Sequence, residues 1–364
     1  MLSTLPEQGV WLEPLAALRS GRWIKWIGGA SNHDLLALED LAALASLAGA
    51  HCLDVAADAA VVAAVRRGIG WARARGAASS PWLMLSISDG EDPHFRKAHF
   101  DPRLCPPQCP RPCARVCPAR AIGAGGGVLE DRCYGCGRCL VACPLGLVVE
   151  RQQRLSATQL AELLVEVQPD AIEIHTCRGR SAEFAQRLGQ LQDAGLRLSL
   201  LSVSCGENLD GPAANAVALP DLPTYLWQLH GLICQTNLAW LWQLDGRPMS
   251  GDVGAGTAQA AVNLLQRWHR QLPPGPLQLA GGTNSDSRRR LAASGGSAGI
   301  AGIAYGGSAR SLLQPFLEGA EQRGKRLLDC PDLWPLACGL LAELWGAPAS
   351  LRNLLEPWMS GAEV

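Results

Sequence analysis

The chain has 364 residues, of which 48% are hydrophobic and 18% are charged, and its formal net charge is −1. This composition is typical of a globular protein with a sizeable core and excludes a disordered chain. A net charge this close to zero gives no electrostatic preference for nucleic acid or for an anionic membrane surface, and we expect neither as a partner.

The compartment is indicated by two features of the sequence. The N-terminal stretch MLSTLPEQGVWLEP lacks a basic segment followed by an apolar one, so we expect no signal peptide. No apolar run reaches the roughly 18 residues that a membrane span needs. We therefore expect a cytoplasmic protein, in which cysteines stay reduced and, at ligand spacing, bind metal rather than form disulfides.

The N-terminal part of the chain alternates short apolar strands with helices. After an irregular or short helical lead-in, the pattern predicts strands at Trp23–Ile27, His51–Val55 and Trp82–Ile87, and helices at Leu35–Ala48 and Ala59–Arg67. Such alternation indicates parallel strands joined by crossover helices. The alternation stops near Asp89 and resumes after a cysteine-rich stretch.

Beyond that stretch the alternation continues. The pattern predicts strands at Ala171–His175, Arg197–Val203, Ala239–Leu244, Leu277–Ala280 and Gly302–Ala304. It predicts helices at Ser156–Val167, Ser181–Ala194, Pro220–Leu232, Thr257–Gln271, Ser285–Ala293 and Ala309–Arg323. The eight strand–helix units are the number that closes a (β/α)8 TIM-type barrel. We therefore expect an α/β fold of this kind rather than an open doubly wound sheet.

The cysteine-rich stretch interrupts the barrel after its third strand, on the face where barrels build active sites. We therefore divide the chain into four parts. Residues 1–99 hold the first three barrel strands, and residues 100–150 form a ferredoxin-like insertion. Residues 151–325 hold strands four to eight, and residues 326–364 form a helical C-terminal tail, with helical spacing at Leu333–Trp345 and Leu351–Trp358.

Eight of the 14 cysteines lie in two runs that each end in Cys-Pro, namely Cys105, Cys109, Cys113, Cys117 and Cys133, Cys136, Cys139, Cys143. The spacing of the second run is that of two-cluster ferredoxins, whose soft thiolates match iron. A zinc ribbon is a poorer alternative, because it needs only four ligands in two pairs. The sequence therefore predicts two iron–sulfur clusters.

In the two-cluster pattern, three cysteines of one run hold one cluster and the fourth crosses to the other. This pattern predicts one cluster on Cys133, Cys136, Cys139 and Cys117, and the other on Cys105, Cys109, Cys113 and Cys143. The first run departs from the pattern, because three residues separate its neighbouring cysteines and four prolines stiffen it. We expect two [4Fe-4S] clusters, with a [3Fe-4S] form left open for the first run.

Paired glycine turns follow the last two predicted strands. These turns comprise Gly281, Gly282 and Thr283 after the seventh strand, and Gly306, Gly307 and Ser308 after the eighth. In many barrels these loops form a phosphate cradle, because glycines let backbone N–H groups approach an anion and a helix dipole favours it. We expect them to bind FMN or another phosphate ligand. Tight turns without a ligand are the alternative.

Other polar side chains lie near strand ends, namely Asp54, Asp58, Glu173, His175, Asp245 and Arg247. Such residues can reach a common pocket and do acid–base chemistry. A satisfied rim histidine and an Asp245–Arg247 pair that braces its loop are the structural alternatives. We expect Lys25 to be a snorkelling or ion-paired lysine rather than an amine catalyst. The six cysteines outside the runs read as free buried thiols, with Cys177 and Cys205 as candidates for a redox thiol.

The order of these features resembles the light-dependent-period (LdpA) family of cyanobacterial iron–sulfur proteins. The resemblance covers most of the chain and rests on the two cysteine runs, the paired Gly-Gly turns, Trp26-Ile-Gly-Gly-Ala30, Cys52-Leu-Asp-Val-Ala-Ala-Asp58 and Asp245-Gly-Arg-Pro-Met-Ser-Gly-Asp252. It implies a protein that senses cellular redox state and passes it to the circadian clock. The partners that it implies are clock input proteins and electron carriers.

Three functions are compatible with these features. We favour a redox sensor that is not an enzyme, in which the barrel relays the state of the clusters to a partner. The alternative is an oxidoreductase whose clusters feed electrons to a flavin or substrate in the barrel mouth, since the barrel is also similar to flavin- and phosphate-binding barrels. A simple electron carrier is least favoured, because it needs no barrel.

Overall fold

The structure is a computed structural model that describes residues 13–77, 80–123, 127–207, 219–247, 254–295 and 299–346. Parallel strands close into a barrel in the order β1-β10-β9-β8-β7-β6-β3-β2. These strands are β1 (Trp23–Gly29), β2 (Cys52–Ala56), β3 (Trp82–Ser88), β6 (Ala171–His175), β7 (Leu200–Cys205), β8 (Trp240–Asp245), β9 (Leu277–Ala280) and β10 (Ile300–Tyr305). The predicted TIM-type barrel is therefore confirmed.

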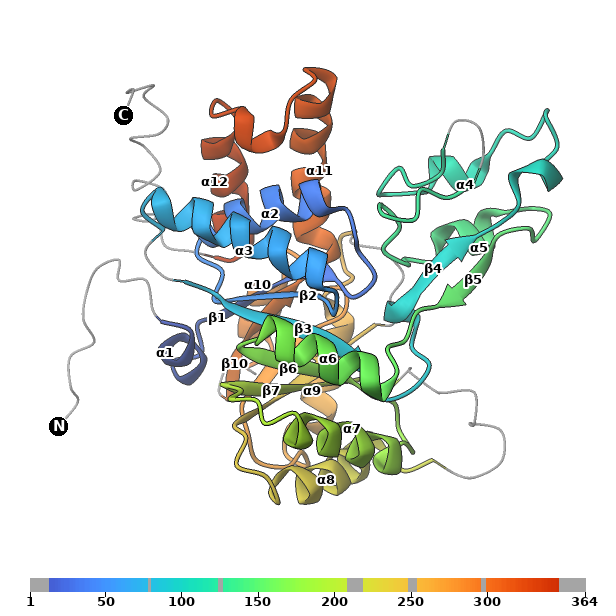
Figure 1. Ribbon diagram of the computed structural model, residues 1–364. Helices are drawn as coiled ribbons and strands as arrows, with labels where there is room; N and C mark the ends of the chain where they lie inside the picture. The colour runs from blue at the N-terminus through green and yellow to red at the C-terminus, as the bar shows by residue number, and fades with distance from the viewer. Residues whose placement is uncertain are drawn as a thin grey trace.

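Helices surround the strands, and a smaller unit projects from one side of the barrel (Figure 1). The helices around the barrel are α1 (Pro14–Arg19), α2 (Leu35–Leu47), α3 (Ala59–Ala74), α6 (Ala157–Val167), α7 (Ser181–Asp193), α8 (Leu222–Ile233), α9 (Gln259–Trp268), α10 (Ser287–Ala293), α11 (Gly307–Gln322) and α12 (Trp334–Leu344). The helical tail is confirmed as far as α12, and the predicted helix Leu351–Trp358 lies outside the described residues.

Most predicted bounds lie within three residues of those in the structure, and two of the differences have a clear physical cause. Helix α3 runs on to Ala74, past the expected end at Arg67, because α2 packs so closely on it that a Cβ at Gly68 would lie 2.4 Å from Glu39 O. Strand β7 begins at Leu200 rather than Arg197, since the intervening residues are not buried and Leu200 is the first to enter the sheet. Both differences come from tertiary packing, which a local pattern does not contain.

The strand pattern separates an outer core from the barrel interior. On β1, Ile24 and Trp26 pack outward in the main hydrophobic core under the helices, while Lys25 between them is fully buried inside the barrel. At the N-terminal end, a second cluster that includes Leu18 of α1 and Trp23 closes the barrel. The open end is therefore the C-terminal one, where the projecting unit is attached.

The projecting unit leaves the barrel after β3 and returns before α6, so the predicted place of the insertion is confirmed. An antiparallel ribbon of β4 (Arg96–His99) and β5 (Val149–Gln152) carries it, with Arg96 opposite Gln152. Beyond the ribbon lie the short helices α4 (Pro112–Arg115) and α5 (Arg138–Ala142) and a 3-10 turn at Pro102–Leu104, while a 3-10 turn at Pro93–Phe95 lies between the barrel and the ribbon.

Ion pairs hold the insertion against α11. Arg120 Nη2 lies 2.6 Å from Glu318 Oε2, and Arg132 Nη2 lies 2.8 Å from Glu321 Oε1. These pairs are partly exposed, so each contributes little stability, but together they set the orientation of the unit. In the part of the chain that the structure describes, no helix combines the length and apolarity of a membrane span.

His51, just before β2, gives the barrel a pH-dependent stability. Its Nδ1 accepts a hydrogen bond of 3.1 Å from the Ile24 N–H, and burial together with the charges of Arg22 and Arg288 lowers its pKa from 6.5 to about 4. The neutral ring therefore stabilises the fold above pH 6.5, and this contribution is lost as the pH falls toward the folded-state value.

We expect the free energy of unfolding to fall by about 2 kcal/mol between pH 8 and pH 5 through His51 alone. In His51→Asn, whose amide oxygen keeps an acceptor for Ile24 and does not titrate, this part of the loss should disappear. Urea unfolding followed by near-ultraviolet circular dichroism at both pH values measures the difference. Equal pH dependence in the parent and the variant would show that His51 does not titrate as argued.

Candidate functional site

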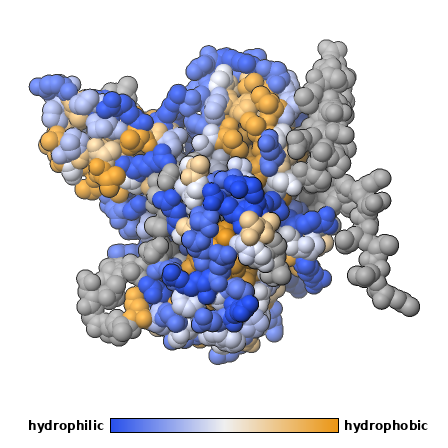
Figure 2. Space-filling view, turned by 180° about the vertical axis from the view of Figure 1, so that it is seen from behind, coloured by the Kyte–Doolittle hydropathy of each residue, from blue (hydrophilic) through white to orange (hydrophobic). Residues whose placement is uncertain are grey.

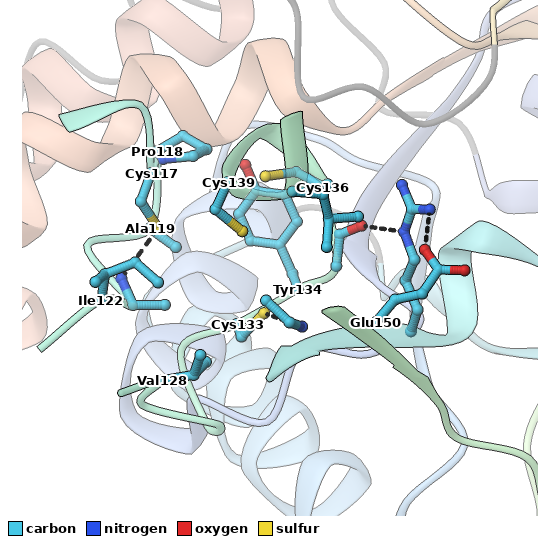
Figure 3. A pocket seen from close by; sticks show the side chains of 16 residues that line it. Cys117, Pro118, Ala119, Ile122, Val128, Cys133, Tyr134, Cys136, Cys139 and Glu150 are labelled. Atoms are coloured by element: carbon cyan, nitrogen blue, oxygen red, sulfur yellow. Dashed lines mark hydrogen bonds and ion pairs between the residues drawn. The ribbon is translucent and has the colours of Figure 1, made fainter. Parts of the chain in front are cut away.

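Four cysteines of the insertion surround one cavity. It is lined by Cys117, Cys133, Cys136 and Cys139 and by apolar side chains that include Ile122 (Figure 3). Cys117 comes from the first run and the other three from the second, which is the combination that the crossing pattern predicts. Two backbone donors face these sulfurs: Ala98 N–H to Cys133 Sγ at 3.4 Å, and Ala121 N–H to Cys117 Sγ at 3.2 Å.

Two glycines make the turn that presents the second run. Gly135 and Gly137 have φ values of 75° and 78°, a region that favours glycine. A Cβ at Gly135 would lie 2.2 Å from Arg96 O, so the turn packs directly on β4. Arg96 Nε donates to Gly135 O at 3.1 Å and fixes this contact. The turn that presents the three thiols is therefore braced by the ribbon.

Two of the thiols around this cavity are poor acids on their own. Burial, together with the charges of Cys136, Cys133 and Cys117, raises the pKa of Cys139 to about 12, and burial also raises the pKa of Cys136. Thiolates crowded in this way need a cation to offset their charge, and iron does so while displacing the protons. Soft donors, backbone N–H groups on the sulfurs and an apolar wall all fit an iron–sulfur cluster.

The remaining four cysteines form a second, more exposed group. Besides desolvation, the pKa of Cys105 is raised by its hydrogen bond to Cys109 and by the charges of Cys109 and Cys113, while Cys143 raises the pKa of Cys113. These influences place Cys143 of the second run beside the first run. Arg111, with φ 47°, begins α4 between prolines and turns the chain within this group.

The barrel mouth forms a second pocket, of about 870 Å³ including its opening, directly below the insertion. It brings together most of the residues that the sequence analysis singled out, namely Asp54, Glu173, His175, Asp245, Arg247, Gly281, Gly282, Thr283, Gly306 and Gly307. Ser308 lies just outside its lining. Gly281 and Gly282 have φ values of 71° and 89°, and α11 begins at Gly307, so backbone N–H groups border this pocket.

Asp58 has a structural role instead. Its carboxylate accepts hydrogen bonds from Ala60 N–H at 2.9 Å and Val61 N–H at 3.0 Å, and so it caps the N-terminus of α3. The other candidates outside the pocket are the thiols of Cys177 and Cys205, which are both buried. Burial raises the pKa of Cys205 well above its ordinary value, which disfavours the reactive thiolate.

The floor of the pocket is a buried ionic network. Lys25 Nζ pairs with Glu173 and lies 3.2 Å from Asp54 Oδ2, and all three side chains are at most 1% exposed. Burial by itself lowers the pKa of Lys25, but the two carboxylates outweigh it, so its pKa is raised and the ammonium is retained. Lys25 is thus ion-paired, and nothing favours it as an amine nucleophile.

Hydrogen bonds extend this network around the barrel. Gln243 Nε2 donates to Glu173 Oε1 at 3.0 Å, and Gln278 donates in turn to Gln243. On the other side, His175 Nε2 lies 3.2 Å from Glu173 Oε1. Burial disfavours the charged ring, yet the hydrogen bond and charge of Glu173 and the charge of Asp92 raise the pKa of His175 to about 9. Burial raises the pKa of Asp245 to about 6.

Two residues that sequence reasoning missed join the cysteines to this pocket. Tyr134, inside the second run, lines both the cysteine cavity and the barrel-mouth pocket. The guanidinium carbon of Arg310 on α11 lies 3.7 Å from the centre of its ring, and Arg310 Nη2 donates to Gly28 O at 2.7 Å. In the sequence, the position of Tyr134 between two candidate ligand cysteines could have indicated its role, whereas no local pattern indicated Arg310.

Removing the buried ammonium should strongly destabilise the barrel. Lys25→Met leaves two buried carboxylates, Asp54 and Glu173, without their shared ammonium, and we expect a loss of about 3–5 kcal/mol in the free energy of unfolding. Adding Glu173→Gln should recover part of this loss. The exposed Lys325→Met is the matched control and should change stability little. Urea unfolding at pH 7.5 measures all four proteins, and a Lys25→Met variant as stable as the control would contradict the network.

Comparisons with known proteins agree with this site. A model described as "Light dependent period A C-terminal domain" matches residues 163–346, and one described as "LdpA Fe-S cluster-binding domain" matches residues 105–154. The chain is 44% identical over 325 residues to Light dependent period A of Synechococcus elongatus, with 88% of this chain and 89% of that protein covered.

Solved structures give weaker likenesses. The carboxyl transferase domain of Rhizobium etli pyruvate carboxylase is 11% identical with a TM-score of 0.43, over 100% of this chain and 54% of that one. The tryptophan synthase alpha chain of Legionella pneumophila is 11% identical with a TM-score of 0.41, over 94% and 97%. Scores this low carry no argument about this chain.

Proposed function

Because this chain belongs to the light dependent period A family and contains its iron–sulfur-binding domain, we propose that it senses cellular redox state and relays it to the circadian clock. When bound, two [4Fe-4S] clusters supply one-electron transfer. The observation that carries the proposal is the gathering of four thiols around one cavity that shares the wall residue Tyr134 with the barrel-mouth pocket. Tyr134 therefore contacts both the thiols proposed to sense redox state and the barrel proposed to relay it.

The contact between Tyr134 and Arg310 supports relay to the barrel. A change of charge among the thiols acts on the Arg310 guanidinium across a single aromatic ring, in a region where burial weakens screening by solvent. Arg310 also binds Gly28 O at the end of β1 and belongs to α11, which carries the ion pairs to the insertion. A shift of Arg310 is thus transmitted to the pocket and to the helix.

Exposed apolar side chains on the insertion support a protein partner. Figure 2 shows hydrophobic residues on this projecting unit, and its large exposed apolar side chains are Leu104, Leu129, Val141, Leu145 and Val149. Gathered apolar surface of this kind marks interaction sites in other proteins. In the proposal, electron carriers and clock input proteins bind here, close to the thiols.

Single cysteine substitutions test the two groups separately. Anaerobically purified protein should contain about eight iron atoms per chain, and Cys136→Ser should lose about four of them, as should Cys109→Ser. Each variant should keep a different electron paramagnetic resonance signal after reduction, because each removes a ligand of a different group. In cyanobacterial cells that carry Cys136→Ser, the clock period should no longer follow light intensity.

The exposed Cys234 belongs to neither group, so Cys234→Ser is the control and should keep all of the iron. Loss of the same signal in both Cys136→Ser and Cys109→Ser would overturn the ligand assignment. Full iron loading with an unchanged light response in Cys136→Ser would overturn the proposed function. A parent protein with about seven iron atoms would instead identify a three-iron cluster at the first run.

A second candidate function is an oxidoreductase that binds FMN or another phosphate ligand in the barrel mouth. The paired glycine turns, the N-terminus of α11 and the side chains of Arg247 and Arg310 border one side of the pocket. Carboxylates and His175 line its floor. An anionic group fits the first side, because a helix N-terminus and guanidinium groups favour it.

A carboxylate placed at the start of α11 should block this ligand. We expect Gly307→Glu to weaken binding of FMN at least tenfold, because its charge takes the place of the phosphate at the helix N-terminus. Gly319→Glu, on the same helix where a Cβ meets no neighbour, is the matched control. Fluorescence titration with FMN measures both variants. Absence of FMN binding to the parent, or equal binding by both variants, would exclude FMN as the ligand of this pocket.

A further inference from the structure

A cluster of metal-ligating side chains lies where the insertion leaves the barrel. Asp92 and His94 belong to the turn between β3 and β4, and His175 ends β6, paired with Ser88 of β3 in the sheet register. Each of the three offers a ligand atom, and these atoms all lie within 4.8 Å of one another. The cluster therefore joins two parts of the chain that are far apart in sequence.

The carboxylate of Asp92 has an unused coordination position. Its Oδ1 binds His94, both at the backbone N–H (2.7 Å) and at Nδ1 (2.6 Å). Its Oδ2 is buried and finds no hydrogen-bond partner within the residues that the structure describes, although the Asp92 side chain is only 1% exposed. A buried carboxylate oxygen without a partner is costly, and a cation beside it would remove that cost.

The surroundings of the cluster also favour a cation. The ring centroids of His94 and His175 lie 4.8 Å apart, so that the two imidazoles are close enough to bind the same ion. Glu173 Oε1 and the Ser86 hydroxyl lie 3.2 Å and 3.3 Å from His175 Nε2, and the Ser204 hydroxyl lies 3.4 Å from the other ring nitrogen, Nδ1. These oxygens match the outer partners that orient histidine ligands in metal sites.

We propose that Asp92, His94 and His175 bind one divalent transition-metal ion of the zinc class at the edge of the barrel mouth. Two imidazoles and one carboxylate are a ligand set that such ions accept with a position left open. His94 and His175 both line the barrel-mouth pocket, so the open position faces that pocket. The site uses none of the cysteines and does not depend on the proposed redox function.

Zinc loading tests the proposal. Cluster-containing protein is equilibrated with Zn²⁺ at pH 8.5, where fewer protons compete for the imidazoles than at neutral pH, and freed of loosely bound metal. Zn²⁺ must also displace the proton that Glu173 favours on His175. We expect about one zinc ion per chain, reduced at least tenfold in His94→Gln and in Asp92→Asn. His33→Gln, which changes a histidine 4.0 Å from Asp58, is the matched control and should keep the zinc.

X-ray absorption at the zinc edge identifies the ligands. The proposal requires nitrogen and oxygen neighbours at about 2.0–2.1 Å and no sulfur, whereas zinc captured by cysteines would show sulfur at about 2.3 Å. Iron and sulfide content should be unchanged in His94→Gln, which shows that the variant folds and keeps its clusters. No zinc in the parent, a sulfur shell, or equal zinc in His94→Gln and His33→Gln would each overturn the proposal.

Discussion

The ion pairs of Lys25 with Asp54 and Glu173 constrain everything that the barrel can do. Barrel interiors are usually filled by layers of branched apolar side chains, whereas here a fully buried ammonium joins β1, β2 and β6. The remaining hydrogen-bond donors and acceptors of these side chains must then find partners nearby, because an unpaired buried polar group is costly. Gln243 and Gln278 meet that need, and Trp23 Nε1 donates to Gln278 at 2.6 Å to end the chain. The floor of the pocket is consequently rigid.

The pocket has an acidic floor and a rim of glycine turns and arginines. Carboxylates and His175 face a ligand from below, while glycine turns and arginines face it from the rim. The segment between β3 and α6 also contributes to the pocket wall, through His94 and Tyr134. One unit thus carries the thiols and also closes the barrel mouth. The barrel is therefore more than a support, because its polar side faces the only part of the molecule described that gathers thiols.

Local patterns predicted those parts of the fold that local forces determine. Strand Ala171–His175 lies at its predicted bounds because turn residues flank it, and Ser156 forms the capping box at the start of α6. The extension of α3 through Gly68 was missed, since only contact with α2 explains a glycine there. The sequence also placed Glu173 at a strand end without its partner, because the pairing with Lys25 exists only once the barrel closes. Arg310 and His94 were missed for the same reason.

The two candidate functions, a redox sensor and an oxidoreductase, share one geometry and differ in how the thiols and the barrel-mouth pocket are coupled. Tyr134 and Arg310 lie between the thiols and the pocket, and in the proposed relay a change of charge at the thiols acts on the pocket through them; thermodynamic linkage makes such coupling reciprocal. Under that proposal, a ligand or metal ion bound beside Arg310 and His175 shifts the midpoint potential of the thiol-bound centre by the same free energy. In a sensor this shift sets the redox range that is reported, and in an oxidoreductase it sets the driving force. The same two residues are thus the point at which both functions would be tuned.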